Sequence, residues 1–253
     1  MTRLINGIIL KKQDYRESDR LFVIYTDELG KIEAVAKGVR KIKSKMAGHL
    51  ELFSVVNLMV APGKTYYQIA GADREKNFLN IKSDLGKTVL ASFCLEVVDI
   101  FTKTDHPDLK IYELIYEILE IFDNEKMKNF LKMYSLSKFF TLKLLSLLGW
   151  TPELYTCVKC KKKIMPSGNF FDAARGGLTC SNCGRGGLPI STTAIKILRF
   201  ILQNDFEKIA VLKITKTNIK ELAKIIDAFV VIRQDRELKS VVWISHLTQV
   251  LKI

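Results

Sequence analysis

Residues 148–187 read LGWTPELYTCVKCKKKIMPSGNFFDAARGGLTCSNCGRGG, and this stretch decides how the whole chain is interpreted. It contains two Cys-x-x-Cys pairs, Cys157/Cys160 and Cys180/Cys183, with 19 residues between Cys160 and Cys180. That spacing is typical of a four-cysteine zinc ribbon, in which each tight turn places two thiolates on one edge of a tetrahedral ion. Glycines near both pairs give the backbone the freedom that such turns need. We therefore predict one structural Zn²⁺ ion per chain, bound by these four cysteines.

Other readings of the cysteines fit the sequence less well. Disulfides require an oxidising compartment, whereas the N-terminus has no signal peptide pattern, so we expect a reducing cytoplasm. A redox role for one pair lacks the surrounding βαβ pattern of such proteins. A zinc deaminase needs a His-x-Glu partner, and none of His49, His106 and His246 lies in one. Four cysteine ligands leave no position open for water, which indicates a structural ion. The fifth cysteine, Cys94, lies in an apolar helical run and is expected in the core.

Length and charge set the broad class of the protein. The chain has 253 residues and a net charge of +13, enough length for two or three domains. The positive charge is concentrated in residues 1–81, in the cysteine-rich stretch 155–187 and in residues 188–253, while residues 82–154 are slightly acidic. This distribution indicates a polyanionic partner. No apolar run reaches 18 residues, so we expect no membrane span.

The first eighty residues are predicted to form five short strands punctuated by Gly, Pro and Asp. The expected strands cover residues 4–12, 20–26, 31–36, 52–61 and 65–70. Such a set predicts a small barrel, and a non-strand insert between the third and fourth strands matches the OB-fold, a barrel that binds nucleic acid on one face.

The insert, residues 37–50, is strongly basic and contains no acid. It is either an ordinary solvated loop or a phosphate-binding segment. We predict DNA-binding residues in it and in the turn between the first two strands: Arg16, Arg20, Lys37, Arg40, Lys41, Lys43 and Lys45. Bases are expected to stack on some of the nearby aromatic residues: Tyr15, Phe22, Tyr25, Phe53 and Tyr66. A second basic group in the cysteine-rich stretch is a weaker candidate for DNA binding and comprises Lys159, Lys161, Lys162 and Lys163.

The rest of the chain is predicted to be helical around the ribbon. Apolar residues recur at helical spacing in residues 85–102, 107–122, 127–148, 191–203, 206–212, 218–234 and 240–251. We therefore predict an α+β multidomain protein, with a five-stranded OB-fold barrel at residues 1–81. An all-α domain at residues 82–253 follows, with a four-cysteine zinc ribbon embedded at 155–187.

The chain resembles the RecO family of bacterial recombination mediators over nearly its whole length. The most specific segments are Thr26–Gly38, the turn at residues 148–154 and Gly176-Gly177-Leu178 before the second cysteine pair. Lys239-Ser240 also fits the family pattern. The resemblance implies an OB-fold, a helical domain and an embedded ribbon, although some members of the family lack the cysteines.

The resemblance also implies a function and a set of partners. Family members bind single- and double-stranded DNA, anneal complementary strands and engage the acidic C-terminal tail of single-stranded DNA-binding protein. With RecR they help to load RecA. We therefore expect a non-enzymatic DNA repair protein of the bacterial cytoplasm, associated with the nucleoid and with no membrane partner.

Two alternative functions remain open from the residues alone. The first is a zinc-ribbon nuclease, although the sequence has no catalytic triad, Walker loop or dinucleotide fingerprint, and we name no catalytic residue. Asp14, Glu17 and Asp19 alternate with Arg16 and Arg20, which favours local salt pairing over two-metal chemistry. The second is an RNA-binding module, because the barrel fold does not distinguish the two nucleic acids.

Overall fold

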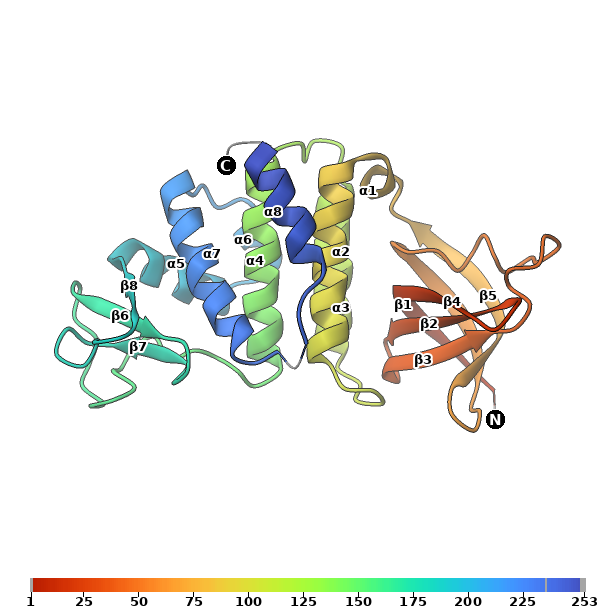
Figure 1. The fold of residues 1–253 in the computed structure, drawn as a ribbon, viewed down its shortest axis with the longest axis horizontal. Coiled ribbons are helices and arrows are strands. Elements are labelled where there is room, and N and C mark those ends of the chain that lie inside the picture. Colours follow the sequence, from red (N-terminus) through yellow and green to blue (C-terminus); the bar gives the residue numbers. More distant parts are fainter. Residues whose placement is uncertain (1, 235, 251–253) are drawn as a thin grey trace. The chain divides into compact units, whose positions relative to one another are not determined.

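The computed structural model describes residues 2–234 and 236–250, and Figure 1 shows its ribbon. The chain divides into two compact units. Unit 1 holds the chain up to residue 128 together with residues 238–247, and unit 2 holds residues 129–237 and the segment from 248 onward. A boundary between residues 81 and 82, as the sequence suggested, stays a prediction. No helix of the described residues is both long and apolar enough to cross a membrane.

Unit 1 begins with the predicted five-stranded barrel. Its strands are β1 (Arg3–Tyr15), β2 (Asp19–Thr26), β3 (Gly30–Ala36), β4 (Ser54–Ala61) and β5 (Tyr67–Asn77). They close in the order β1-β2-β3-β5-β4, all antiparallel except for the short parallel contact between β3 and β5, which is the topology of an OB-fold. Alternate side chains fill the interior, among them Ile9, Phe22, Ile24, Val56 and Leu58. The fold class that the sequence predicted is therefore confirmed.

Several strand limits differ from the prediction, including the end of β1, which continues three residues further to Tyr15; the differences at β4 and β5 have identifiable reasons. We expected the fourth strand to start at residue 52, but Phe53 has a φ of +56° and breaks the extended backbone before Ser54. The fifth strand was expected to end at residue 70, yet β5 continues to Asn77, paired with β4 through two bulges. Its last residues are polar and charged because that end of the strand is largely exposed, so they lack the apolar alternation of a strand.

Three helices complete the first part of unit 1 and cover one side of the barrel. They are α1 (Leu79–Ser83), α2 (Leu85–Phe101) and α3 (Leu109–Asp123). The Tyr25 hydroxyl donates to the Asp108 carbonyl oxygen at 3.3 Å, and the Asp105 amide donates to the Lys31 carbonyl oxygen at 2.9 Å. Cys94 is buried in α2, as predicted. The five-residue α1 was not predicted, because a segment of one turn is too short to show periodicity.

The turn between β2 and β3 requires glycine. Gly30 has a φ of +67°, a conformation that disfavours residues with a Cβ. A Cβ at this position would also lie 2.3 Å from the carbonyl oxygen of His106. Backbone from the loop before α3 therefore approaches the barrel as closely as glycine permits, which holds that loop against the barrel within unit 1.

Unit 2 combines helices with the cysteine-rich ribbon. Its helices are α4 (Phe130–Leu147), α5 (Thr192–Gln203), α6 (Phe206–Ala210) and α7 (Lys216–Val231). The ribbon is a small sheet of β6 (Asn169–Asp172), β7 (Gly177–Thr179) and β8 (Leu188–Ile190), in the order β7-β6-β8. The last helix, α8 (Ser240–Val250), was predicted to reach Leu251, which lies outside the described residues. Within unit 1, the carboxylate of Glu96 accepts hydrogen bonds from the amides of Lys239 and Ser240 at the start of α8.

Side-chain caps set the starts of the helices in unit 2. The Asn129 side chain accepts from the Lys132 amide, so α4 starts at Phe130, three residues after the predicted position. Ser191 caps α5 in the same way, so this helix starts at Thr192, one residue after the start of the predicted range. Thr215 caps α7, which therefore starts two residues before the predicted Asn218.

Candidate metal centre and nucleic-acid interface

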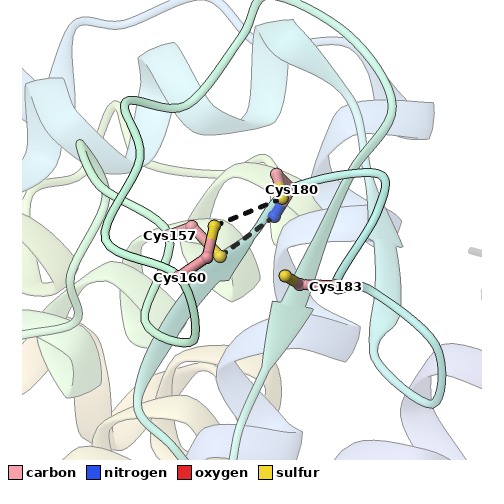
Figure 2. A group of neighbouring side chains, drawn as sticks. All are labelled: Cys157, Cys160, Cys180 and Cys183. Carbon is pink, nitrogen blue, oxygen red and sulfur yellow. Dashed lines mark hydrogen bonds between the residues drawn. The ribbon is translucent and has the colours of Figure 1, made fainter.

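The four predicted metal ligands come together in the ribbon. Cys157 and Cys160 lie in the loop before β6, and Cys180 and Cys183 lie in the loop after β7. Their sulfur atoms all lie within 4.8 Å of one another, and those of Cys160 and Cys180 are 3.8 Å apart. Figure 2 shows the four side chains converging on one point, with each pair provided by its own loop. No other group of three or more His, Cys, Asp or Glu side chains in the described residues has comparable spacing.

Each Cys-x-x-Cys pair is closed by a backbone turn. The Lys161 amide donates to the Cys157 carbonyl oxygen at 2.8 Å, and the Cys183 amide donates to the Cys180 carbonyl oxygen at 3.0 Å. The Cys180 amide also points at the Cys157 sulfur, 3.5 Å away. Backbone amides directed at a sulfur favour its thiolate form, which is the form that binds metal.

The surroundings of the clustered thiols shift the pKa values of two of them in opposite directions. Burial alone would raise the pKa of Cys157, but the amides of Cys160, Cys180 and Lys159 outweigh burial and lower this pKa to about 6. The pKa of Cys183 shifts upward instead, to about 12, because of its contacts with the Cys180 and Cys160 thiols. Four sulfurs this close cannot all be thiolates unless a positive ion offsets their mutual repulsion.

The geometry of the cluster fits zinc. A Zn–S bond of about 2.3 Å in a regular tetrahedron places neighbouring sulfurs about 3.8 Å apart. The separation of the Cys160 and Cys180 sulfurs is 3.8 Å. Soft thiolate ligands in a tetrahedral arrangement are typical of zinc or iron–sulfur sites. The donor set therefore fits the predicted ion, whose coordination the four cysteines would complete.

The ribbon is fixed to the helices of unit 2 by polar contacts. The Arg199 guanidinium on α5 donates to the Leu154 carbonyl oxygen and stacks over the Tyr155 ring, 4.3 Å from its centroid. Arg233, two residues after the end of α7, donates to the Ala173 carbonyl oxygen at 3.1 Å. The Ser191 hydroxyl donates to Glu221 at 2.8 Å. These contacts make ribbon and helices one folded unit.

The predicted DNA-binding residues of the barrel differ in their partners. Arg20 and Arg40 both pair with Asp14, at 3.0 and 3.2 Å. Arg40 also donates to the Glu17 carbonyl oxygen at 3.2 Å, so this arginine ties the insert to the turn between β1 and β2. The local salt pairing expected for Asp14 is thus confirmed. Arg16 in the same turn is exposed and lies over the Tyr15 ring at 5.3 Å.

The four lysines of the insert, Lys37, Lys41, Lys43 and Lys45, are all exposed. Within residues 2–234 and 236–250, none of them has an acidic side chain within 4.0 Å. The insert itself has no strand or helix, as predicted, but Val39 and Leu50 are buried in the barrel core. An ordered loop anchored at both ends therefore presents four lysines to solvent.

Three of the aromatic residues expected to stack bases are instead part of the core. Phe22 fills the barrel interior, and Phe53 is 4 % exposed. Tyr25 faces the loop before α3, and burial raises its pKa to about 12. These three are therefore not stacking surfaces: β2, which holds Phe22 and Tyr25, is buried on both faces, and Phe53 is buried just before β4. Tyr15 and Tyr66 remain half-buried at the surface.

The four lysines of the ribbon differ in their contacts and exposure. Lys159 donates to the Cys183 carbonyl oxygen at 2.8 Å and lies 4.0 Å from Asp172, so it stabilises the turn around the metal centre. Lys161, Lys162 and Lys163 are exposed beside it. DNA binding by this group stays a prediction.

A groove that the sequence analysis did not identify lies between α4 and α7. Two adjoining hollows of about 270 Å³ each share Leu131 and Ile219 as an apolar floor. Four lysines line them: Lys132, Lys213, Lys220 and Lys224. Lys220 and Lys224 are four residues apart on one face of α7, a spacing that was visible in the sequence. The apolar partner on α4 was not visible there, because it depends on how the helices pack.

Comparison with known proteins gives consistent matches. A family model described as "Recombination protein O N terminal" matches residues 1–78, and one described as "Recombination protein O C terminal" matches residues 82–241. A protein named DNA repair protein RecO from Dehalococcoides mccartyi strain 195 is 34% identical over 245 residues, covering 96% of this chain and 95% of its own. A protein of the same name from Caldanaerobacter subterraneus is 30% identical, covering 92% of this chain and 94% of its own. Another from Desulfatibacillum aliphaticivorans is also 30% identical, covering 96% of each chain.

Proposed function

The chain belongs to the RecO family, and on that premise we propose that it is a recombination mediator in DNA repair. In this proposal it binds single- and double-stranded DNA and anneals complementary strands. It acts with single-stranded DNA-binding protein and RecR to help load RecA, in the bacterial cytoplasm at the nucleoid. It binds and positions nucleic acid without catalysing a reaction of its own.

The observation that carries the proposal is the exposed lysine loop on the OB-fold. Lys37, Lys41, Lys43 and Lys45 project from a loop whose ends are buried in the barrel. Because Val39 and Leu50 are buried in the barrel core, the loop keeps its four lysines close together although no acidic side chain among the described residues pairs with them. Lysines without acidic partners are available to neutralise phosphates, and the release of counterions from DNA then drives binding. Because α3 and the loop before it cover another side of the barrel, we place DNA at the insert.

The proposal assigns a structural role to the metal centre. We propose that Cys157, Cys160, Cys180 and Cys183 hold one zinc ion, which cross-links the two loops of the ribbon. Their spacing and sulfur donors support zinc. The ion keeps Lys159 and the neighbouring Lys161–Lys163 in a fixed loop, where they offer a second surface to DNA.

Strand annealing tests the proposal directly. Addition of the protein should accelerate annealing of two complementary DNA strands, both naked and coated with single-stranded DNA-binding protein. Fluorescence quenching between dyes on the two strands measures the rate. RNA strands of equal length and sequence serve as the comparison. No acceleration with DNA, or acceleration confined to RNA, would reject the mediator function.

The groove between α4 and α7 is the proposed site for the tail of single-stranded DNA-binding protein. Such a tail is acidic and ends in an apolar residue, so it needs an apolar floor and a cation for its carboxylate. Leu131 and Ile219 provide the floor, and Lys220 and Lys224 provide cations at the rim. The one acid in the groove, Asp227, already pairs with the buried Lys138 at 2.6 Å. Its negative charge is therefore compensated and does not repel an acidic peptide.

A peptide of the tail should bind the full chain, and replacing Lys220 and Lys224 with glutamine should weaken binding roughly 5- to 30-fold. Each exposed ion pair is worth up to ~1 kcal/mol, which sets this range. Fluorescence anisotropy with a labelled peptide measures the change. The matched control replaces Lys103 and Lys110, two exposed lysines of unit 1, and should bind as the unaltered chain does. If a scrambled peptide of equal charge binds equally well, the groove does not recognise the tail.

A further inference from the structure

A small pocket opens at one end of the barrel, where three loops meet. It is lined by the turn between β1 and β2 with the strand residues at its two ends, by the first residue of the insert and by the loop between β4 and β5, and Val35 of β3 and Gln68 of β5 complete the lining. Its volume is about 190 Å³. This is smaller than the ~300–1,000 Å³ of sites for drug-sized ligands. Such a pocket suits one planar ring rather than a larger molecule.

Two tyrosines form the aromatic part of the pocket. The rings of Tyr15 and Tyr66 meet edge to face, with centroids 5.8 Å apart and an angle of 83° between their planes. Both side chains are half-buried, so neither ring is enclosed by the core. Tyr15 is the last residue of β1 and Tyr66 lies in the loop between β4 and β5, and their contact fixes the two rings relative to each other. A fixed, partly exposed ring is a stacking surface for a base.

Cations surround this aromatic pair. Arg16, Lys37 and Lys64 line the pocket, and all three are exposed. The one acid in the lining is Asp19, whose carboxylate accepts a hydrogen bond from the Gly38 amide at 2.8 Å. Asp19 thus holds the start of the insert in place. The pocket therefore combines an aromatic interior with a positively charged rim.

We propose that this pocket takes one unstacked base of a single DNA strand. The base stacks on the face of Tyr66, the perpendicular Tyr15 ring supports Tyr66 from the side, and the phosphates on either side contact Arg16, Lys37 and Lys64. The proposal rests on the DNA-binding function proposed above and adds a preference to it. Bases in a duplex are stacked on their neighbours and paired, so they cannot enter the pocket without being extruded. A duplex contacts only the cations, whereas a single strand contacts the cations and the rings.

The experiment uses the full chain and three probes of equal length: a single strand, a duplex, and a single strand in which all nucleotides are abasic. The abasic strand keeps the phosphates but has no rings to stack. Fluorescence anisotropy at one fixed salt concentration measures all three affinities. The unaltered chain should bind the normal single strand roughly 5- to 150-fold more tightly than the abasic one, the range expected for one stacked base.

Substitutions at Tyr66 locate the effect. Tyr66→Leu should remove most of the difference between the normal and abasic strands and leave duplex binding within about twofold, since the cations of the rim are unchanged. Tyr66→Phe keeps the ring and should retain the preference. Thermal unfolding of each variant identifies a loss of fold. The abasic comparison on the unaltered chain needs no variant and stands even if Tyr66→Leu does not fold.

The outcomes separate this inference from the function on which it rests. Equal binding of normal and abasic strands by the unaltered chain would overturn the base pocket, while salt-dependent binding of both would still support a DNA-binding barrel. A folded Tyr66→Leu chain that loses duplex and single-strand binding equally would also overturn it. Absence of binding to all three probes would reject the proposed DNA-binding function itself.

Discussion

Replacing Cys160 with serine should release the zinc ion and loosen residues 155–187, while the barrel stays folded. Cys160 is one of the four proposed ligands, and its sulfur lies 3.8 Å from that of Cys180. Metal binding at such sites is coupled to local folding, with apparent free energies of about 10–16 kcal/mol in zinc-finger peptides. The ribbon strands β6 to β8 have only three or four residues each, so the proposed ion would supply much of what holds the two loops together. Elemental analysis measures the metal, and hydrogen exchange measures the loosening.

The fifth cysteine provides the control for this experiment. Cys94 is fully buried in α2 of unit 1 and is not among the clustered thiols. Cys94→Ala removes a thiol without touching the ribbon, so the zinc content should remain one ion per chain. Hydrogen exchange should rise in residues 155–187 of the Cys160→Ser chain and stay low in β1 to β5. Anaerobically purified, unaltered protein that contains no zinc would contradict the assignment, as would full zinc content in Cys160→Ser.

The metal centre was predictable because its signal is local. Two residues between the cysteines of a pair fix a turn, and the turn fixes the distance between the sulfurs. The contacts that attach the ribbon to its unit were not predictable in the same way. Arg199 and Arg233 donate to carbonyl oxygens of Leu154 and Ala173, 45 and 60 residues away. Such pairings follow from helix packing and leave no periodic pattern in the sequence.

In the barrel, too, some features were predictable from the sequence and others were not. The alternation of apolar residues gave its five strands and the non-strand insert, whereas the burial of its aromatic residues depended on covering elements. In a barrel wall, one face of a strand normally points to solvent, so Tyr25 was a reasonable candidate for base stacking. In the structure, the loop before α3 covers that face and accepts the hydrogen bond of the Tyr25 hydroxyl. Of the five aromatic candidates, Tyr15 at the end of β1 and Tyr66 in the loop between β4 and β5 stay accessible.

Neutralising the lysines of the insert should have the largest effect on DNA binding. Replacing Lys37, Lys41, Lys43 and Lys45 with glutamine removes four cations that have no acidic partner in the described part of the chain. Each phosphate contact on a single strand contributes about −0.7 to the slope of log K against log salt concentration, so the slope should flatten by about 2.8. At 0.1 M salt this corresponds to a loss of roughly several hundred-fold in affinity. Titrations at several salt concentrations measure the slope, and strand annealing should slow in parallel.

Arg40 is left unchanged in this variant for a structural reason. It pairs with Asp14 and donates to the Glu17 carbonyl oxygen, so its loss would also detach the insert from the turn between β1 and β2.

The matched control replaces four exposed lysines of unit 1 outside the barrel, Lys103, Lys110, Lys126 and Lys128, and lowers the net charge by the same amount. If DNA binding depends on the insert, the control keeps the original slope. If both variants flatten the slope equally, the net charge of the protein drives binding. If the insert variant keeps the original slope, the DNA site lies elsewhere, and Lys161, Lys162 and Lys163 of the ribbon become the next residues to test.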